Sequence, residues 1–312
     1  MGTNNYVPYH MHTYFSLLDS CTSPEAYCQR ASEEGMTALC FTEHGNIYNW
    51  YAKLQLCKQY NLKYLHGVEC YVTIAHDPKV RDNMHTILIA KNMDGFKELN
   101  NLCFLATQPD HTYYKPRISV EEFLDISDNI IKISACIQSP LWKMREDTEL
   151  MDKLLKKYDY YEVQYHTFED NIEYTKLLCF FSSKYGKPLI AGTDTHSLDK
   201  YKAECRTMLQ YGKTKGAWGD AENACDLTFK SYDELVEAFV KQGVMSKEVI
   251  LEAIENTNRM ADSCEEIVID THNKYPYLYG EKDEEVLWDV IHKNYDDKLL
   301  ADRKSGSAGM PR

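Results

Sequence analysis

The chain has 312 residues, of which 44% are hydrophobic and 27% charged, so it can bury a sizeable core. Its net charge of −13, with no Lys/Arg run resembling a track for phosphates, argues against tight, autonomous binding to nucleic acid. The charge does not exclude a phosphate-cleaving site, because bound cations reverse the local potential.

The 11 cysteines are scattered without a CxxC pair, which predicts reduced thiols in a cytoplasmic protein rather than a disulfide framework. No apolar stretch reaches the ~18 residues that a membrane span needs. The first residues contain no apolar core of a signal peptide. Residues 304–312 are predicted to be a disordered tail or a cloning remnant.

Short strand-like runs alternate with helix-like segments over the first 200 residues. The predicted strands are Tyr6–His12, Ala38–Thr42, Tyr64–Val72, His85–Ala90, Ile130–Ser134, Tyr161–Gln164 and Leu189–Gly192. The predicted helices are Pro24–Glu34, Tyr48–Tyr60, Phe96–Ala106, Thr148–Tyr158 and Asn171–Tyr185. Ser23 is expected to cap the first helix and Gly35 to close it. This alternation predicts a parallel sheet, open or closed into a barrel, with its chemistry at the C-terminal ends of the strands.

The pattern becomes mainly helical after about Lys200. Helices are predicted at Ser231–Val240, Lys247–Ala261 and Asp283–Leu300. We therefore expect an α/β domain over residues 1–200 and a helical extension over residues 201–303.

Metal-binding residue types gather at the ends of successive strands. They are His10, His12, Asp19, His44, Glu69, His85, Cys136, Asp194 and His196. His10 and His12 share a face of their strand because residues two apart point to the same side. Borderline metals such as zinc select His, Cys and carboxylate ligands, so these nine residues could hold more than one ion.

Each of these residues also has a plain structural interpretation. Cys136 alone fits a core position, Glu69 a partly exposed strand position, and Asp194 with His196 a turn and a cap. Independent core or surface residues would not fall mostly at the same end of successive strands, and this joint occurrence favours a metal site.

The nine residues resemble the four motifs of the PHP (polymerase and histidinol phosphatase) family. Several longer segments are similar, in order, to the N-terminal PHP domain of bacterial-type DNA polymerase III alpha subunits. These segments are HMHTYFSLLDS, GVECYV, HTILIAKNMDGFKELNNL, PRISVEEF, ISACI, YYEVQYH, YGKT, FKSYDELVEAF and AIENTNRMADSCE. Ser20 stands where polymerase members usually have Gly, and the fourth motif reads GTDTH rather than TNDxH. Neither departure removes a ligand.

The resemblance implies a distorted seven-stranded (β/α) barrel of TIM type with a site for three ions. It implies that His10, His12, Glu69 and Asp194 hold one ion, and that Glu69 bridges to a second ion held by His85 and Cys136. Asp19, His44 and His196 would hold the third. Two to three divalent ions are expected, with zinc favoured and manganese or iron as alternatives.

The resemblance also implies a metal-dependent phosphoesterase, most specifically a proofreading 3′–5′ exonuclease. Asp194 and Glu69 would serve the reaction, and His166 would contact phosphate, protonate a leaving group, or be structural. Lys91 and Arg117 are phosphate contacts or, in the simpler interpretation, solvated surface residues. A polymerase core, on the same chain or a partner chain, would deliver the DNA.

Two other functions are compatible with the sequence. One is a small-molecule phosphatase of the histidinol-phosphate type, and the other is an inactive structural module that docks a separate proofreading exonuclease. The aspartates of a polymerase palm are not visible in the sequence, so DNA polymerisation by this chain is not expected.

Overall fold

A computed structural model of the chain describes residues 5–77, 79–214, 225–274 and 278–294. They fall into two compact units, one ending at Val268 and the other beginning at Ile269. The second unit contains a short 3-10 helix, η1 (Gly280–Lys282), and helix α11 (Asp283–Lys293), none of whose residues is buried. The predicted helix Asp283–Leu300 is confirmed as far as Lys293, and residues 295–300 lie outside the described part of the chain.

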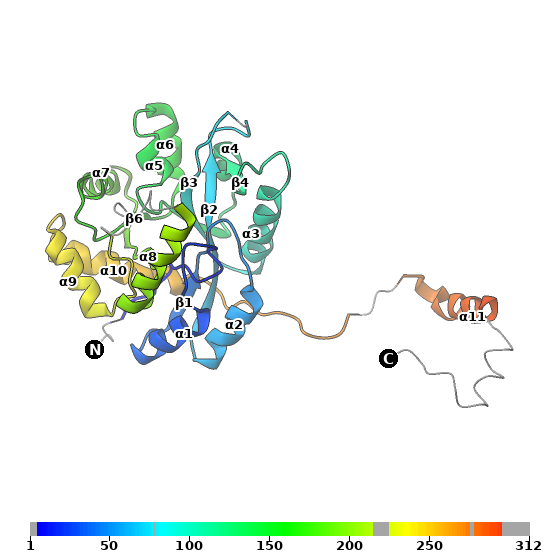
Figure 1. The fold of residues 1–312 in the computed structure, drawn as a ribbon. Helices are drawn as coiled ribbons and strands as arrows, with labels where there is room; N and C mark the ends of the chain where they lie inside the picture. Colours follow the sequence, from blue (N-terminus) through cyan, green and yellow to red (C-terminus); the bar gives the residue numbers. More distant parts are fainter. Residues whose placement is uncertain (1–4, 78, 215–224, 275–277, 295–312) are drawn as a thin grey trace. The chain divides into compact units, whose positions relative to one another are not determined.

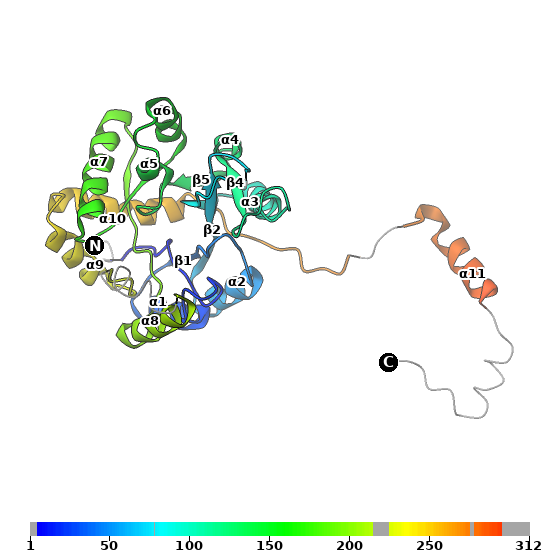
Figure 2. The same ribbon diagram turned by 45° about the horizontal axis from the view of Figure 1, so that its top comes forward.

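The first unit is an α/β structure built on two sheets (Figures 1 and 2). The five-stranded sheet contains β1 (Ala38–Phe41), β2 (Lys63–Thr73), β3 (Met84–Ala90) and β5 (Ile130–Ile133) in that order, and β4 (Arg117–Ser119) pairs with β2. The two-stranded sheet pairs β6 (Tyr161–Val163) with β7 (Leu189–Ala191) in parallel. The α/β class is thus confirmed.

The expected all-parallel sheet is wrong at β3. This strand runs antiparallel to both β2 and β5. Parallel pairing of successive strands needs a crossover of about a dozen residues or more, and the connection over residues 74–83 is shorter than that. The sheet is therefore mixed.

The predicted strand Tyr6–His12 is also wrong. Only Met11 forms a bridge, to Thr195, although the segment is buried. Pro8 has no N–H with which to continue a ladder, but its carbonyl accepts a hydrogen bond from Cys40 N at 3.1 Å. The segment thus lies between the end of β1 and the residues after β7 without being a strand.

The expected closed barrel is not found among the described residues. A single bridge, Ile133–Tyr160, joins the β5 side to the β6 side, and the Met11–Thr195 bridge joins the β7 side to the N-terminal segment. Isolated bridges of this kind replace the ladders that would close a barrel, so the distorted barrel stays a prediction.

The predicted helices of the first unit are present, with shifts of a few residues at their ends. They are α1 (Pro24–Glu33), α2 (Trp50–Gln59), α3 (Met93–Ala106), α6 (Thr148–Lys157), α7 (Glu169–Tyr185), α9 (Tyr232–Gln242) and α10 (Lys247–Asp262). The Oγ of Ser23 accepts a hydrogen bond from Ala26 N, and Gly35 follows α1 with a φ of 71°, as predicted. The sequence interpretation did not place α4 (Val120–Asp125), α5 (Pro140–Lys143) or α8 (Lys200–Thr214) individually.

Helix α10 shares a core with the strands. Its Met260 and Ala261 are buried in one hydrophobic cluster with Val7, Cys40 and Ile190. Helix α10 is therefore packed into the first unit, and the proposed division after residue 200 stays a prediction. In the described segments, no helix combines the length and the apolar character that crossing a membrane requires.

Candidate metal centre

The structure brings all nine predicted residues to one edge of the sheets. His44 follows β1, Glu69 lies in β2, Cys136 follows β5, and Asp194 and His196 follow β7. His85 lies near the start of β3, and because β3 runs antiparallel, its start is at the same edge as the ends of its neighbours. Each of the nine lies within hydrogen-bonding or close contact distance of another, the longest such separation being 3.9 Å between Cys136 Sγ and His85 Nδ1.

Two carboxylates lie between the imidazoles. Glu69 Oε1 is 3.2 Å from His10 Nε2 and 2.7 Å from His85 Nδ1, and Oε2 contacts His44 Nδ1. Asp194 Oδ1 is 3.1 Å from His10 Nε2 and 3.3 Å from His12 Nε2. Both side chains are thus in a position to bridge cations.

Asp19 closes the other side of the cluster. Its Oδ2 is 2.8 Å from His44 Nε2 and 3.3 Å from His196 Nε2. Its Oδ1 accepts hydrogen bonds from Arg206 Nη2 at 2.6 Å and from Gln210 Nε2 at 2.9 Å, both on α8. Helix α8 therefore fixes Asp19, which lies in the loop after the N-terminal segment.

Three of the histidines have an outer nitrogen that is already hydrogen-bonded. His10 Nδ1 donates to Glu162 Oε1 at 2.8 Å, and His196 Nδ1 donates to the backbone carbonyl of Asp194 at 2.8 Å. His12 Nδ1 lies 2.9 Å from Ser16 Oγ. Hydrogen-bonding partners of this kind set the tautomer and orientation of metal-binding histidines.

The tautomer of His12 follows from the partners of Ser16. The Ser16 hydroxyl donates its proton to Glu43 Oε2 at 2.6 Å, so its oxygen can only accept from His12. The proton of His12 is therefore on Nδ1, and the lone pair of Nε2 faces Glu69 and Asp194. In their neutral forms, which are the forms that bind metals, His10 and His196 also carry the proton on Nδ1, so that the lone pair of Nε2 is directed inward.

Glu162 and Glu43 were missed by the sequence interpretation. Glu162 lies in β6 with 1% exposure, and it accepts hydrogen bonds from Tyr9 and Gln164 as well as from His10. Glu43 is fully buried and pairs with Lys53 at 2.7 Å. An acidic residue between apolar neighbours on a strand was the available signal for Glu162, since carboxylates are almost never fully buried without partners.

The buried charges shift one another's pKa values. Burial, together with the neighbouring His44 and His196, lowers the pKa of His12 to about 3, so this ring is neutral at pH 7. Although burial opposes ionisation, the facing histidines hold the pKa values of Glu69 and Asp194 well below their usual range. Ionised carboxylates and a neutral imidazole are the forms in which these groups bind metals.

Burial raises the pKa of the Cys136 thiol well above its usual value. A neutral thiol is a poor ligand, and a thiolate here needs a nearby cation to stabilise it. Cys136 therefore joins a metal centre only when binding of the ion drives its deprotonation.

The cluster passes a direct test of fit for divalent cations. Four buried atoms, His12 Nε2, His44 Nδ1, Glu69 Oε2 and Asp194 Oδ1, face one another at contact distance but lack the geometry of a hydrogen bond to any described residue. A buried polar atom left unsatisfied costs about 1–3 kcal/mol. One or more cations among these lone pairs would satisfy all four, and the donor set of His, Asp, Glu and Cys suits zinc or a similar metal.

Two residues of the cluster region have left-handed backbone conformations. Asp194 has a φ of 46°, and Ala135, which precedes Cys136, has a φ of 59°. Such conformations are costly for residues other than glycine and persist where the surrounding structure imposes them, often at functional sites. The conformation at Asp194 is held by Thr195 N, which donates to His10 O at 3.0 Å.

His166 is not part of the nine-residue cluster. It follows β6, is 6% exposed, and its carbonyl accepts hydrogen bonds from Asn171 and Gln242. Its ring stacks on Phe168 with centroids 5.9 Å apart. Burial lowers the pKa of His166 to about 4.

The surface interpretation of Arg117 is wrong. Arg117 is 1% exposed, and its Nη1 donates to Val80 O at 2.8 Å, so it braces the connection between β2 and β3. Lys91 is half-buried at the end of β3, where its backbone N and O bond to Asn129 and Glu265.

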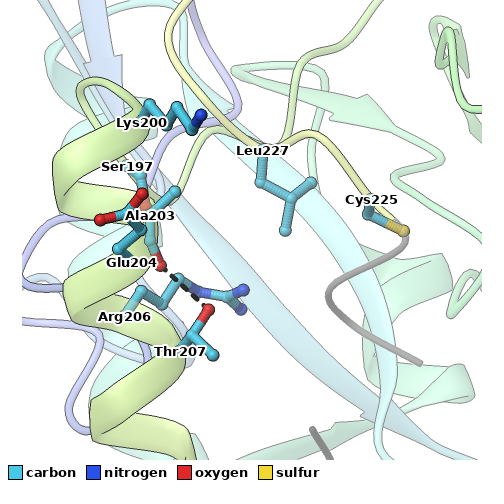
Figure 3. Close-up of a pocket in the computed structure, with 8 residues that line it drawn as sticks. All are labelled: Ser197, Lys200, Ala203, Glu204, Arg206, Thr207, Cys225 and Leu227. Carbon is cyan, nitrogen blue, oxygen red and sulfur yellow. Dashed lines mark hydrogen bonds between the residues drawn. The ribbon is translucent and has the colours of Figure 1, made fainter. Parts of the chain in front are cut away.

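A hollow of about 200 Å³ lies beside the cluster. Figure 3 shows α8 forming one wall, with Lys200, Arg206 and Thr207 on it, and Leu227 facing them. Two residues that line the hollow also contact or adjoin the metal-centre candidates. Arg206 holds Asp19, and Ser197 follows His196 in the sequence, so the hollow lies next to the centre.

A comparison with known proteins identifies the family of the chain. Residues 8–178 match the family described as "PHP domain". The α/β fold and the buried cluster of histidines and carboxylates define a candidate metal-dependent hydrolase. This chain belongs to the PHP family.

Its relatives include DNA polymerase III alpha subunits. That of Aquifex aeolicus is 27% identical over 84% of this chain and 25% of its own length, and that of Helicobacter pylori strain 26695 is 27% identical over 82% of this chain and 22% of its own length. The chain thus spans about a quarter of the length of these relatives. A putative metal-dependent phosphoesterase from Bifidobacterium adolescentis superposes with a TM-score of 0.42 at 14% identity, over 64% of this chain and 96% of its own.

Proposed function

We propose that the chain is a metal-dependent phosphoesterase that removes nucleotides from a DNA 3′ end. The observation that carries this proposal is the convergence of three imidazole Nε2 lone pairs, from His10, His12 and His196, on the carboxylates of Glu69, Asp194 and Asp19. The relationship to polymerase alpha subunits supports DNA as the substrate class.

We infer that all nine clustered residues hold the cations, up to three ions in total. Glu69 and Asp194 each face more than one imidazole, which suits bridging positions. Bound divalent ions supply Lewis-acid activation of the phosphate and of water, and zinc, manganese and iron all suit these donors.

The chain's own residues orient the ligand side chains. Glu162, Ser16 and the Asp194 carbonyl fix three imidazole rings through Nδ1. Arg206 holds Asp19 from the opposite side. A cluster held in this way loses little free energy to reorganisation during the reaction, which is the basis of electrostatic preorganisation.

His166 is proposed to contact the phosphate rather than to protonate the leaving group. With a pKa near 4 its ring is neutral at pH 7, so it can donate an N–H hydrogen bond but does not carry the extra proton of a general acid. Its replacement should therefore affect substrate binding more than the pH profile.

The hollow beside α8 is a candidate position for the terminal nucleotide. Lys200 and Arg206 line it, together with Glu204, in a chain with a net charge of −13, and Arg206 also pairs with Asp19. That overall charge disfavours long-range attraction of DNA, so we propose that a polymerase core, on the same chain or a partner chain, delivers the 3′ end.

Cleavage of 3′-labelled single-stranded DNA, combined with elemental analysis of metal content, tests the proposal. Wild type with two to three ions per chain is expected to shorten the DNA, and Asp194→Ala is expected to lose this activity. Asp94→Ala provides a matched control, because Asp94 is 78% exposed and pairs with Lys97 at the surface. Histidinol phosphate serves as the alternative substrate.

The other outcomes are informative. Hydrolysis of histidinol phosphate without cleavage of DNA would identify a small-molecule phosphatase. Full metal content without any hydrolysis would favour the structural module that docks a separate exonuclease. Equal DNA cleavage by wild type and Asp194→Ala would overturn the assignment of the active site.

A further inference from the structure

Three side chains outside the nine-residue cluster also form a compact group. His76 belongs to the connection between β2 and β3, His111 follows α3, and Glu122 lies in α4. His76 Nε2 is 3.0 Å from Glu122 Oε2, and His111 Nε2 is 2.8 Å from Glu122 Oε1. The two imidazole centroids are 4.0 Å apart. The carboxylate of Glu122 thus faces the Nε2 atoms of both histidines.

The carboxylate of Glu122 is fixed by its place in the helix. Ser119 N donates to Glu122 Oε2 at 2.7 Å and Glu122 N donates to Ser119 Oγ at 3.1 Å, which is a capping box. Glu122 therefore presents its oxygens in a set direction before any ligand arrives.

The segment that carries His76 is braced independently. Asp82 accepts hydrogen bonds from Ile74 N at 2.8 Å and from Thr73 Oγ1 at 3.0 Å, and buried Arg117 donates to Val80 O. These contacts do not involve His76, so they hold the flanking backbone without the pair to Glu122. Rigid support of this kind is what a metal site requires of its ligands.

The partners of His111 indicate which nitrogen is available to a ligand. His111 Nδ1 is 2.9 Å from Asp110 Oδ1, and an ionised carboxylate can only accept, so Nδ1 carries a proton. In the neutral ring, Nε2 then has its lone pair directed at Glu122, where two acceptors would repel each other. Either a second proton or a cation has to lie between them.

A cation explains more of the arrangement than a second proton does. A carboxylate bound to the outer nitrogen of a histidine is the usual partner of a metal-binding imidazole. Zinc at about 2.0 Å from each of two tetrahedral ligands sets those ligands roughly 3.3 Å apart. The observed separations of 2.8 and 3.0 Å need only a small opening of the group to reach that value.

We propose that His76, His111 and Glu122 form a second divalent-cation site of zinc type, separate from the nine-residue cluster. The three ligands leave a fourth position open to water, since the side chains of His76, His111 and Glu122 are 21%, 11% and 29% exposed. An ion there links the connection 74–83, the segment after α3 and helix α4.

Zinc stoichiometry of the full chain tests this site apart from any hydrolysis. After equilibrium dialysis against zinc, the double variant His76→Gln/His111→Gln is expected to hold one ion fewer per chain than wild type. His272→Gln serves as the matched control, because His272 is 95% exposed and also pairs with a carboxylate, Asp270, at 2.8 Å. It should retain the wild-type content.

A second measurement separates the two sites. The variant Glu69→Gln/Asp194→Asn, checked for folding by circular dichroism, is expected to keep one zinc ion, which is lost when His76→Gln/His111→Gln is added. If Glu69→Gln/Asp194→Asn does not fold, the difference in zinc content between wild type and His76→Gln/His111→Gln is sufficient to test the proposed site. Equal zinc content in wild type and His76→Gln/His111→Gln would overturn the proposal and show a protonated His–Glu pair instead.

Discussion

Glu162 accepts the Nδ1 proton of His10 at 2.8 Å, although the two residues are 152 positions apart in the sequence. Both side chains are fully or almost fully buried. The contact leaves His10 Nε2 facing Glu69 and Asp194, at 3.2 and 3.1 Å. Glu162 is therefore a positioning residue for the candidate centre.

Replacing Glu162 by Gln should weaken metal binding without removing a ligand. The uncharged amide stabilises the Nδ1–H tautomer less and places an NH2 group against Tyr9 or His10, both of which now donate to the carboxylate. Loss of such a partner typically lowers metal affinity roughly 10–100-fold. Competition with a fluorescent zinc chelator measures the change, and Glu121→Gln, at an exposed position of α4, is the control. Equal affinities would show that Glu162 does not orient His10.

Gly192→Ala should disturb the same pair from the other side. A Cβ at Gly192 would lie 2.3 Å from Glu162 Cδ, a distance that forces the buried carboxylate to move. Overpacking of this kind costs about 1–3 kcal/mol, and the displaced carboxylate should also lower zinc affinity. Gly212→Ala in α8 is the matched change, since a Cβ there meets no atom within 4 Å and alanine favours helix. Urea unfolding compares the two; a Gly192→Ala variant as stable as Gly212→Ala would contradict the expected clash.

The i, i+2 spacing of the histidines allowed much of the centre to be predicted. The spacing paired His10 with His12 and Asp194 with His196, although neither pair lies on a strand in the structure. The strand-end rule placed the remaining candidates at the same edge. All nine indeed lie together. Which of them bind metal stays a prediction, because proximity does not by itself demonstrate coordination.

Long-range partners could not be predicted in the same way. Glu162 and Arg206 contact His10 and Asp19 across 152 and 187 positions, and no local pattern links them. The burial of Arg117 depends on how the connection 74–83 folds over it, which an exposed-looking polar segment does not reveal. The antiparallel orientation of β3 follows from the short connection 74–83. The repeated β-α alternation elsewhere in the sequence favoured a parallel strand at this position instead.

Lys53→Met should destabilise the fold strongly. Lys53 Nζ pairs with Glu43 Oε1 at 2.7 Å, and the two side chains are 2% and 0% exposed. Removing one partner of a buried ion pair leaves the other charge uncompensated, which costs about 3–5 kcal/mol. Urea unfolding in the presence of chelator measures the loss without a contribution from bound metal.

Lys153→Met is the control for that change. Lys153 pairs with Glu149 at 2.9 Å, but it is 56% exposed, so its loss should destabilise the fold far less than the loss of Lys53. Similar losses for Lys53→Met and Lys153→Met would mean that the buried pair does not carry a special penalty. The double variant Lys53→Met/Glu43→Gln should recover part of the stability, because no buried charge remains.

His66 should make the stability of the fold depend on pH between about 4 and 6.5. Tyr64 OH donates to His66 Nδ1 at 2.9 Å and His66 Nε2 donates to Asn100 Oδ1 at 3.1 Å, so the neutral ring is satisfied. Burial lowers the pKa of His66 to about 4, whereas the unfolded chain has a histidine pKa of about 6.5. In this interval the unfolded state binds more protons, and the free energy of unfolding therefore rises with pH.

The size of that effect can be isolated by comparison with His66→Gln. The stability difference between wild type and this variant should shrink as pH falls from about 6.5 to 4, by on the order of 3 kcal/mol over the whole interval. Urea unfolding in chelator at several pH values measures it, and His272→Gln, at an exposed ring, is the control. A difference that stays constant with pH would mean that His66 accepts a proton in the folded state as readily as in the unfolded chain.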